Sequence, residues 1–196
     1  MTNLAHQYQF PFEYCGGPET EMIDGVIVAM APTPNLSHQR AARSLRNIFS
    51  KYLKGKSCEL FDNFAVHLSE ENYFVPDMMV VCNKDIIKNN GIHGAPDLVV
   101  EILSPSTAKY DKGRKMDIYG ECGVKEYWLV DTANHAIEVY LPKDGRLKLD
   151  DIYAIYPDWM LEMMSDETKA KIPMQFKTSL FDDLLISVEE VFEDIL

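Results

Sequence analysis

The segment from residue 95 to residue 104, APDLVVEILS, constrains the fold more than any other part of this chain. It is a nearly continuous apolar run that contains two acids, Asp97 and Glu101. A run of this length and composition is typical of a strand that is buried on both faces of a sheet. We therefore expect a central sheet with helices packed on it.

The sequence before this strand predicts a hairpin and a helix. Asp24 and Gly25 mark the turn of a short hairpin over residues 21–32. Apolar side chains then recur at spacings of three and four over residues 37–54, which predicts a helix capped by Asn35 or Ser37. Strands are expected after this helix, over residues 57–69 and 72–82.

The sequence after the strand predicts a second helix and more strands. The helix covers residues 108–122, with Thr107 able to cap it and Gly123 ending it. Further elements are expected in three places: two strands over 125–142, a hairpin over 146–156, and a last helix whose capping box is Ser187-Val-Glu-Glu190. This order indicates one α/β or α+β domain over residues 1–196, with a core at about 20–142 and an acidic C-terminal extension over 149–196.

The charge is unevenly distributed along the chain. It has 19 Lys and Arg against 31 Asp and Glu, a net charge of −12, which taken alone argues against nucleic-acid binding. Residues 149–196 hold 12 of the acids and 3 of the bases, whereas residues 25–58 hold no acid. A second basic cluster lies at residues 109–115. We therefore expect weak nucleic-acid binding that depends on salt and metal.

The sequence also predicts the cellular location of the protein. No apolar run reaches the roughly 18–20 residues of a membrane span, and the N-terminus does not resemble a signal peptide. The four cysteines are scattered and form no CxxC pair. A reduced, cytoplasmic protein without a membrane partner is the simplest interpretation.

Two acids lie in apolar surroundings. Asp77 follows Pro76 in FVPDMMVV, and Glu101 lies inside LVVEILS. A carboxylate is costly to bury unless a cation, a metal or dedicated donors compensate it. Two such acids at one end of a sheet would suit Mg²⁺ or Mn²⁺, which prefer oxygen ligands. The alternative is that each acid ends a strand in water.

The helix after Glu101 adds a lysine. Asp111, Lys115 and Tyr119 are four residues apart and share one helix face. Because this helix directly follows the strand of Glu101, Lys115 can reach over the end of that strand. Two acids, a metal and a lysine suit phosphodiester hydrolysis. The alternative is an ordinary surface pair between Asp111 and Lys115.

These residues form an ordered set of motifs. They are Val75-Pro76-Asp77, then APDLVVEILSPST over 95–107, then Asp111-x-x-x-Lys115-x-x-x-Tyr119, then Gly123-Val124-x-Glu126-Tyr127-Trp128-Leu-Val-Asp131. Together they resemble the Uma-two-type putative restriction endonuclease family of the PD-(D/E)XK nuclease-like superfamily. The resemblance extends from about residue 21 to the final helix.

The resemblance implies a restriction-endonuclease-like fold, in which a mixed central sheet is flanked by helices and carries a metal site at its edge. It assigns Asp77 and Glu101 as the acids that bind Mg²⁺ or Mn²⁺. In an unaltered motif a lysine would occupy the position of Leu103. The resemblance indicates that its role has moved to Lys115, with Lys112 as the alternative.

Three other residues match or imitate the family pattern. His38 matches a recurrent position and is a candidate catalytic residue, although a capping or core histidine fits as well. Glu21 matches too, either as an extra acid or as a strand residue. Asp97 repeats the Pro-Asp pair but lies four residues before Glu101, so we interpret it as a strand-start residue.

The leading hypothesis is a metal-dependent endonuclease that hydrolyses DNA. A cutter of duplex DNA would work as a homodimer, so that two sites face two strands. The first alternative is a catalytically silent module of the same fold that binds nucleic acid or protein. The second is a metal-dependent hydrolase of RNA or of a small phosphodiester.

Overall fold

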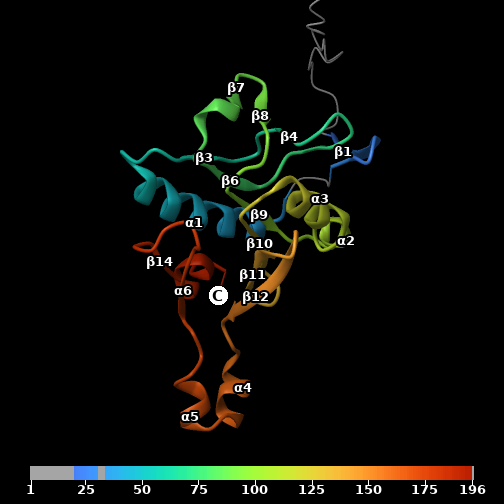
Figure 1. Ribbon diagram of the computed structural model, residues 1–196. Helices are drawn as coiled ribbons and strands as arrows, with labels where there is room; N and C mark the ends of the chain where they lie inside the picture. Colours follow the sequence, from blue (N-terminus) through green and yellow to red (C-terminus); the bar gives the residue numbers. More distant parts are fainter. Residues whose placement is uncertain (1–19, 31–33, 196) are drawn as a thin grey trace, which may run out of the picture.

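The computed structural model describes residues 20–30 and 34–195, in which a six-stranded mixed sheet forms the centre (Figure 1). Strands β9 and β10 are parallel and the other neighbours are antiparallel. In spatial order the strands are β12 (Arg146–Ala154), β11 (Ala136–Lys143), β10 (Glu126–Asp131), β9 (Leu98–Ile102), β6 (Met78–Val81) and β3 (Glu59–Phe61).

A second six-stranded sheet lies above the central sheet in Figure 1. Its strands are short, and only β4 and β8 are parallel neighbours. In spatial order they are β2 (Val26–Ala29), β1 (Thr20–Ile23), β5 (Tyr73–Phe74), β4 (Val66–His67), β8 (Gly91–His93) and β7 (Ile87–Lys88). A single 3₁₀ turn, η1 (Lys84–Ile86), precedes β7.

The described helices are one long helix and several short ones. They are α1 (Leu36–Leu53), α2 (Ala108–Asp111), α3 (Arg114–Cys122), α4 (Asp158–Met163), α5 (Asp166–Lys169) and α6 (Val188–Phe192). A two-stranded sheet of β13 (Gln175–Lys177) and β14 (Leu185–Ser187) precedes α6. None of the described helices is long and apolar enough to cross a membrane.

The central strand β9 is buried on both faces, as its sequence predicts. All five of its residues are buried. Leu98 and Val100 pack with α1 and α6 in one hydrophobic core. Val99 belongs to a second core, on the other face of the sheet, which α3 and the second sheet cover. The expected mixed sheet flanked by helices is therefore confirmed.

Several elements differ from the sequence prediction. Residues 57–69 contain two strands, β3 and β4, and residues 72–82 contain β5 and β6, where one strand each was predicted. The second helix is divided into α2 and α3 at Gly113. Residues 146–154 form a single long strand that pairs with β11, so the hairpin predicted over 146–156 is wrong. The Asn35 side chain caps α1, and Gly123 ends α3 in the left-handed conformation, as predicted. The Ser187 side chain caps α6, whereas Thr107 makes no side-chain cap hydrogen bond at the start of α2.

The acidic C-terminal region is divided between the core and the surface. Val191 and Phe192 of α6 are fully buried in the core beside α1. Ion pairs join Arg43 of α1 to Asp194 and Lys56 to Asp183. By contrast, residues 158–171, which carry α4 and α5, extend away from the body of the molecule (Figure 1). Part of the basic surface predicted for α1 is therefore neutralised by C-terminal acids.

The expectation that all cysteines are reduced is contradicted. Cys58 and Cys82 form a disulfide that joins the chain just before β3 to the chain just after β6. The two cysteines lie 24 residues apart in sequence, and only the pairing of β3 with β6 brings them together. Cys122 is free and exposed.

Candidate active site

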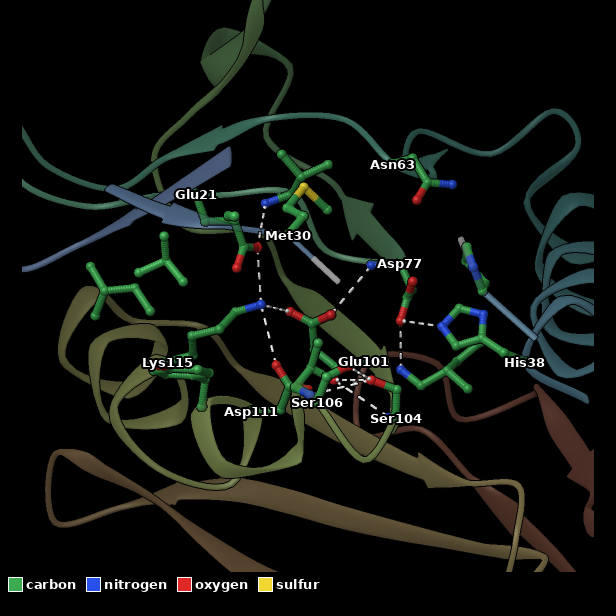
Figure 2. A pocket seen from close by; sticks show the side chains of 18 of the residues that line it. Glu21, Met30, His38, Asn63, Asp77, Glu101, Ser104, Ser106, Asp111 and Lys115 are labelled. Carbon is green, nitrogen blue, oxygen red and sulfur yellow. Dashed lines mark hydrogen bonds and ion pairs between the residues drawn. The ribbon is translucent and has the colours of Figure 1, made fainter. Parts of the chain in front are cut away.

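Asp77 and Glu101 are brought together by the pairing of β6 with β9. The register places Met78 opposite Val100, so Asp77 and Glu101 form the next pair along the two strands. The Ile102 amide donates to the Asp77 carboxylate at 2.7 Å, and the Asp77 amide donates to Glu101 Oε2 at 3.4 Å. The two acids therefore lie side by side at one end of the central sheet (Figure 2).

Lys115 lies at the centre of a group of carboxylates (Figure 2). Its Nζ is 2.7 Å from Glu101 Oε1, 3.0 Å from Glu21 Oε1 and 3.3 Å from Asp111 Oδ1. Its side chain is only 5% exposed. The hydroxyl of Tyr119 also donates to Glu101, at 3.4 Å. The helix face predicted from the spacing of Asp111, Lys115 and Tyr119 is thus directed at Glu101.

Burial and charge act together on these groups. Burial raises the pKa of Glu101 well above its usual range, although Lys115 acts in the opposite direction. Burial alone would lower the pKa of Lys115, but Glu101, Glu21 and Asp111 together raise it well above its usual range. Lys115 therefore remains a cation, and it is the group that makes the neighbouring carboxylates tolerable in an apolar core.

His38 approaches Asp77 from the first turn of α1. Its Nε2 is 3.2 Å from Asp77 Oδ2, and a proton on Nε2 lets the ring donate to that carboxylate. The Nδ1 atom is buried and has no hydrogen-bond partner among the described residues. The His38 amide donates to Asn35 Oδ1 at 2.9 Å, so the cap of the helix also fixes the place of the histidine.

Glu21 reaches the site because the hairpin of β1 and β2 is attached to α3. The guanidinium of Arg114 donates two hydrogen bonds to Asp24 in the hairpin turn, at 2.7 and 2.8 Å. Glu21 Oε1 accepts from the Val75 amide at 2.9 Å as well as from Lys115. Glu21 therefore links the hairpin, the strand segment before Asp77 and the helix of Lys115.

These side chains line one cavity of about 470 Å³. It contains four carboxyl groups, from Glu21, Asp77, Glu101 and Asp111, against the single ammonium group of Lys115. This excess of oxygen donors suits a hard cation. No group of three or more His, Cys, Asp or Glu among residues 20–30 and 34–195 is arranged as a ready metal cage. Mg²⁺ binds through one or two carboxylates and keeps several waters, so Asp77 and Glu101 fit it.

Two residues with similar sequence signals lie elsewhere. Lys112, the alternative to Lys115, pairs with Glu138 of β11 at 2.6 Å and does not line the cavity. Asp97 accepts from the Cys82 amide at 2.7 Å and pairs with Lys125 at 2.6 Å, also outside the cavity. The geometry therefore places Lys115 beside the acids and gives Asp97 a structural contact.

The cavity also has lining residues that sequence reasoning missed. They are Asn63, Ser104, Ser106, Thr107 and Tyr110, with apolar neighbours from the hairpin. The Ser104 hydroxyl contacts those of Ser106 at 2.9 Å and Thr107 at 3.0 Å. The SPST run that follows Glu101 could have indicated this hydroxyl cluster. Asn63 had no comparable sequence signal. It lies in a loop and has a left-handed φ of 49°.

Known proteins are similar to this chain in sequence and in fold. The model of the Uma2 family, described as putative restriction endonuclease, matches residues 8–164. The chain belongs to this family. The Uma2 chain is 33% identical over 155 residues to the uncharacterized protein slr1290 of Synechocystis sp., covering 72% of this chain and 81% of the relative. It is 28% identical over 127 residues to the uncharacterized protein sll1609 of the same organism, covering 62% and 71%.

A solved structure has the same fold as this Uma2 protein. It is the crystal structure of a putative nuclease belonging to DUF820 from Anabaena variabilis, with a TM-score of 0.70 and 20% sequence identity. The match covers 91% of this chain and 92% of the other. The family description supports nuclease function, and the solved structure shows the fold.

Proposed function

We propose that this protein is a metal-dependent endonuclease that hydrolyses phosphodiester bonds of DNA. The observation that carries the proposal is the contact of Lys115 Nζ with Glu101 at 2.7 Å, in a cavity that Asp77 also lines. Family membership and a nuclease-like fold support a nucleic-acid substrate. The excess of carboxyl groups in the cavity supports a bound cation, because an anionic phosphate would otherwise be repelled.

In this proposal each residue has a separate role. Asp77 and Glu101 would hold Mg²⁺ or Mn²⁺, which polarises a phosphoryl oxygen and lowers the pKa of bound water. Lys115 would stabilise negative charge on the phosphate or orient the attacking water. His38 would fix the Asp77 carboxylate through its Nε2, and Glu21 and Asp111 would fix Lys115.

Cleavage assays with matched lysine variants test the proposal. We expect the wild type to cleave DNA in Mg²⁺ or Mn²⁺, and Glu101→Gln and Lys115→Met to lose roughly 100- to 1000-fold in rate. Lys112→Met is the control, because Lys112 pairs with Glu138 outside the cavity. Plasmid, linear and single-stranded DNA and RNA should be compared. Activity that survived in Lys115→Met but not in Lys112→Met would reject the assigned lysine.

Metal binding has a readout that does not need cleavage. We expect millimolar Mg²⁺ or Mn²⁺ to raise the melting temperature of the wild type, because a ligand of the folded state stabilises it. The double variant Asp77→Asn with Glu101→Gln should lose this shift. An equal shift in that variant would place the ion elsewhere.

The silent binding module is the second candidate, and one observation favours it. Many of the basic side chains expected to meet DNA are already paired with acids of the same chain. These pairs are Arg43 with Asp194, Arg46 with Asp62, Lys56 with Asp183, Lys112 with Glu138, and Arg114 with Asp24. If no substrate is cleaved and no metal shifts the melting temperature, this candidate replaces the endonuclease.

Assembly and location belong to the same proposal. A protein that cuts both strands of a duplex would act as a homodimer, which measurement of its mass in solution would test. A cytoplasmic location stays a prediction. The Cys58–Cys82 disulfide removes the argument from reduced cysteines for this location, because stable disulfides are uncommon in reducing compartments.

A further inference from the structure

The cavity has apolar lining residues that the proposed hydrolysis does not use. Ile23, Val28 and Met30 of the β1–β2 hairpin line it, together with Tyr110 of α2. They share the cavity with Asp77, Glu101 and Lys115. Its volume of about 470 Å³ is in the range of sites that bind small organic groups. A metal and a phosphate would contact Asp77, Glu101 and Lys115 and leave these apolar residues without a ligand.

Tyr110 is an exposed aromatic residue of the cavity lining. It is 41% exposed, whereas its neighbour Asp111 is buried. Its amide donates to the Thr107 carbonyl at 2.8 Å, which fixes the backbone. The ring makes no aromatic contact with another described residue. An aromatic face without an aromatic partner among the described residues suits stacking on a flat ring.

The polar residues between Glu101 and Tyr110 suit the sugar and phosphate of a nucleotide. Ser104, Ser106 and Thr107 present three hydroxyl groups that can donate or accept. The exposed Lys109 lies next to Tyr110 in sequence and can meet a backbone phosphate. The cavity lining therefore combines carboxylates, hydroxyl groups and an aromatic ring.

We infer that the apolar lining residues bind the base of an unpaired nucleotide next to the phosphate that is cleaved, with Tyr110 stacked on that base. The inference rests on the proposed endonuclease function and names its substrate class, single-stranded or locally unpaired DNA. A base inside a duplex is stacked on both faces and cannot meet Tyr110 without leaving the helix. Stacking on an aromatic side chain tolerates any base, so no sequence preference is required.

Binding measurements with matched oligonucleotides test this inference. The probes are a fluorescent single-stranded DNA, the same strand with one abasic position, and the blunt duplex of the same sequence, all in Ca²⁺. We expect the intact single strand to bind the wild type more tightly than the duplex. Tyr110→Ala should weaken that binding roughly 5- to 150-fold, whereas Tyr110→Phe should keep it. The strand whose missing base is the stacked one should bind the wild type and Tyr110→Ala equally.

A second tyrosine provides the control. Tyr156 is 37% exposed and does not line the cavity, so Tyr156→Ala should bind as the wild type does. The inference is overturned if Tyr110→Ala binds the single strand as tightly as the wild type, or if the duplex is preferred. Cleavage that is insensitive to Tyr110 would overturn only this inference. Absence of cleavage with Tyr110-dependent binding would overturn only the endonuclease.

Discussion

Glu126 is a fully buried carboxyl group outside the cavity. It accepts hydrogen bonds from Trp128 Nε1 at 2.6 Å, from the Ser179 amide at 2.7 Å and from the Ser179 hydroxyl at 2.6 Å. Its partners include Ser179 of the C-terminal region, 53 residues away in sequence. Glu126 therefore joins the C-terminal region to the central sheet.

Replacing Glu126 should destabilise the fold without altering the cavity. In Glu126→Gln one carboxylate oxygen becomes an NH₂ group that faces a donor, so at least one buried donor loses its acceptor. We expect a loss of about 1–3 kcal/mol in the free energy of unfolding, measured with urea. The exposed Glu162→Gln should change it by less than about 0.5 kcal/mol. Equal effects would show that the three hydrogen bonds contribute nothing net.

Single residues were predicted from sequence where their neighbours made them unusual. Asp77 and Glu101 were recognisable because an acid in an apolar strand needs compensation, and the structure places the two side by side. Glu126 lies in the same kind of strand, but the run Glu126-Tyr127-Trp128 indicates ordinary packing. Its hydrogen-bonding partner Ser179 is too distant in sequence for any local pattern to reveal it.

At the scale of elements, the division between α2 and α3 matters most for the site. Gly113 lies between them, with φ −123° and ψ −117°. A Cβ atom at this position would lie 2.8 Å from the Lys109 carbonyl oxygen, which real structures do not tolerate. The glycine therefore permits the turn across which Lys115 Nζ lies 3.3 Å from Asp111 Oδ1.

Gly113→Ala should disturb this arrangement. Since the clash is with backbone, α2 or α3 must shift, and we expect a loss of about 1–3 kcal/mol in stability together with reduced nuclease activity. Gly145→Asn is the control, because Gly145 has space around it and a φ of 75° that asparagine tolerates. Urea unfolding and cleavage rates provide the two readouts. Full activity in Gly113→Ala would mean that the break is not required.

The mispredicted elements have weak local sequence signals. The sequence of 108–122 has continuous helical spacing, and a glycine inside such a pattern is often tolerated, so Gly113 does not by itself predict a break. The break is defined by the backbone of Gly113, whose φ of −123° and ψ of −117° are not helical. Strands β4 and β5 have two residues each, which is too short for an alternating pattern to show. By contrast, α1 is long and strongly patterned, and the predicted range of 37–54 differs from it by one residue at each end. Strand β9 was predicted correctly in kind, but it covers only the five residues Leu98–Ile102 of the predicted range 95–104.

At the scale of the whole molecule, the net charge of −12 hides a set of internal pairings. The C-terminal region carries most of the excess acid, and two of its aspartates neutralise cations in or next to α1. Asp194 pairs with Arg43, and Asp183 contacts both Lys56 and Tyr52. The basic surface available to an anionic partner is therefore smaller than the sequence indicates.

Removing these two acids should strengthen DNA binding. In Asp183→Asn with Asp194→Asn, Arg43 and Lys56 become available to phosphates, so affinity should rise and the salt dependence should steepen by up to about two ions. The control is Asp150→Asn with Asp158→Asn, which changes the net charge equally at exposed acids that pair with no described base. Binding titrations at several salt concentrations measure both. If both double variants gained the same DNA affinity, the effect would come from net charge alone.

The segment of α4 and α5 has a consequence for how this protein can be extended. Residues 158–171 stand away from the body, and none of them lines the cavity. Both ends of the segment connect to strands, β12 and β13, that remain in the folded body. Additional sequence inserted there would be carried as an appendage, without touching the cavity. The projection is therefore the natural attachment point for a module that delivers the nuclease to a chosen target.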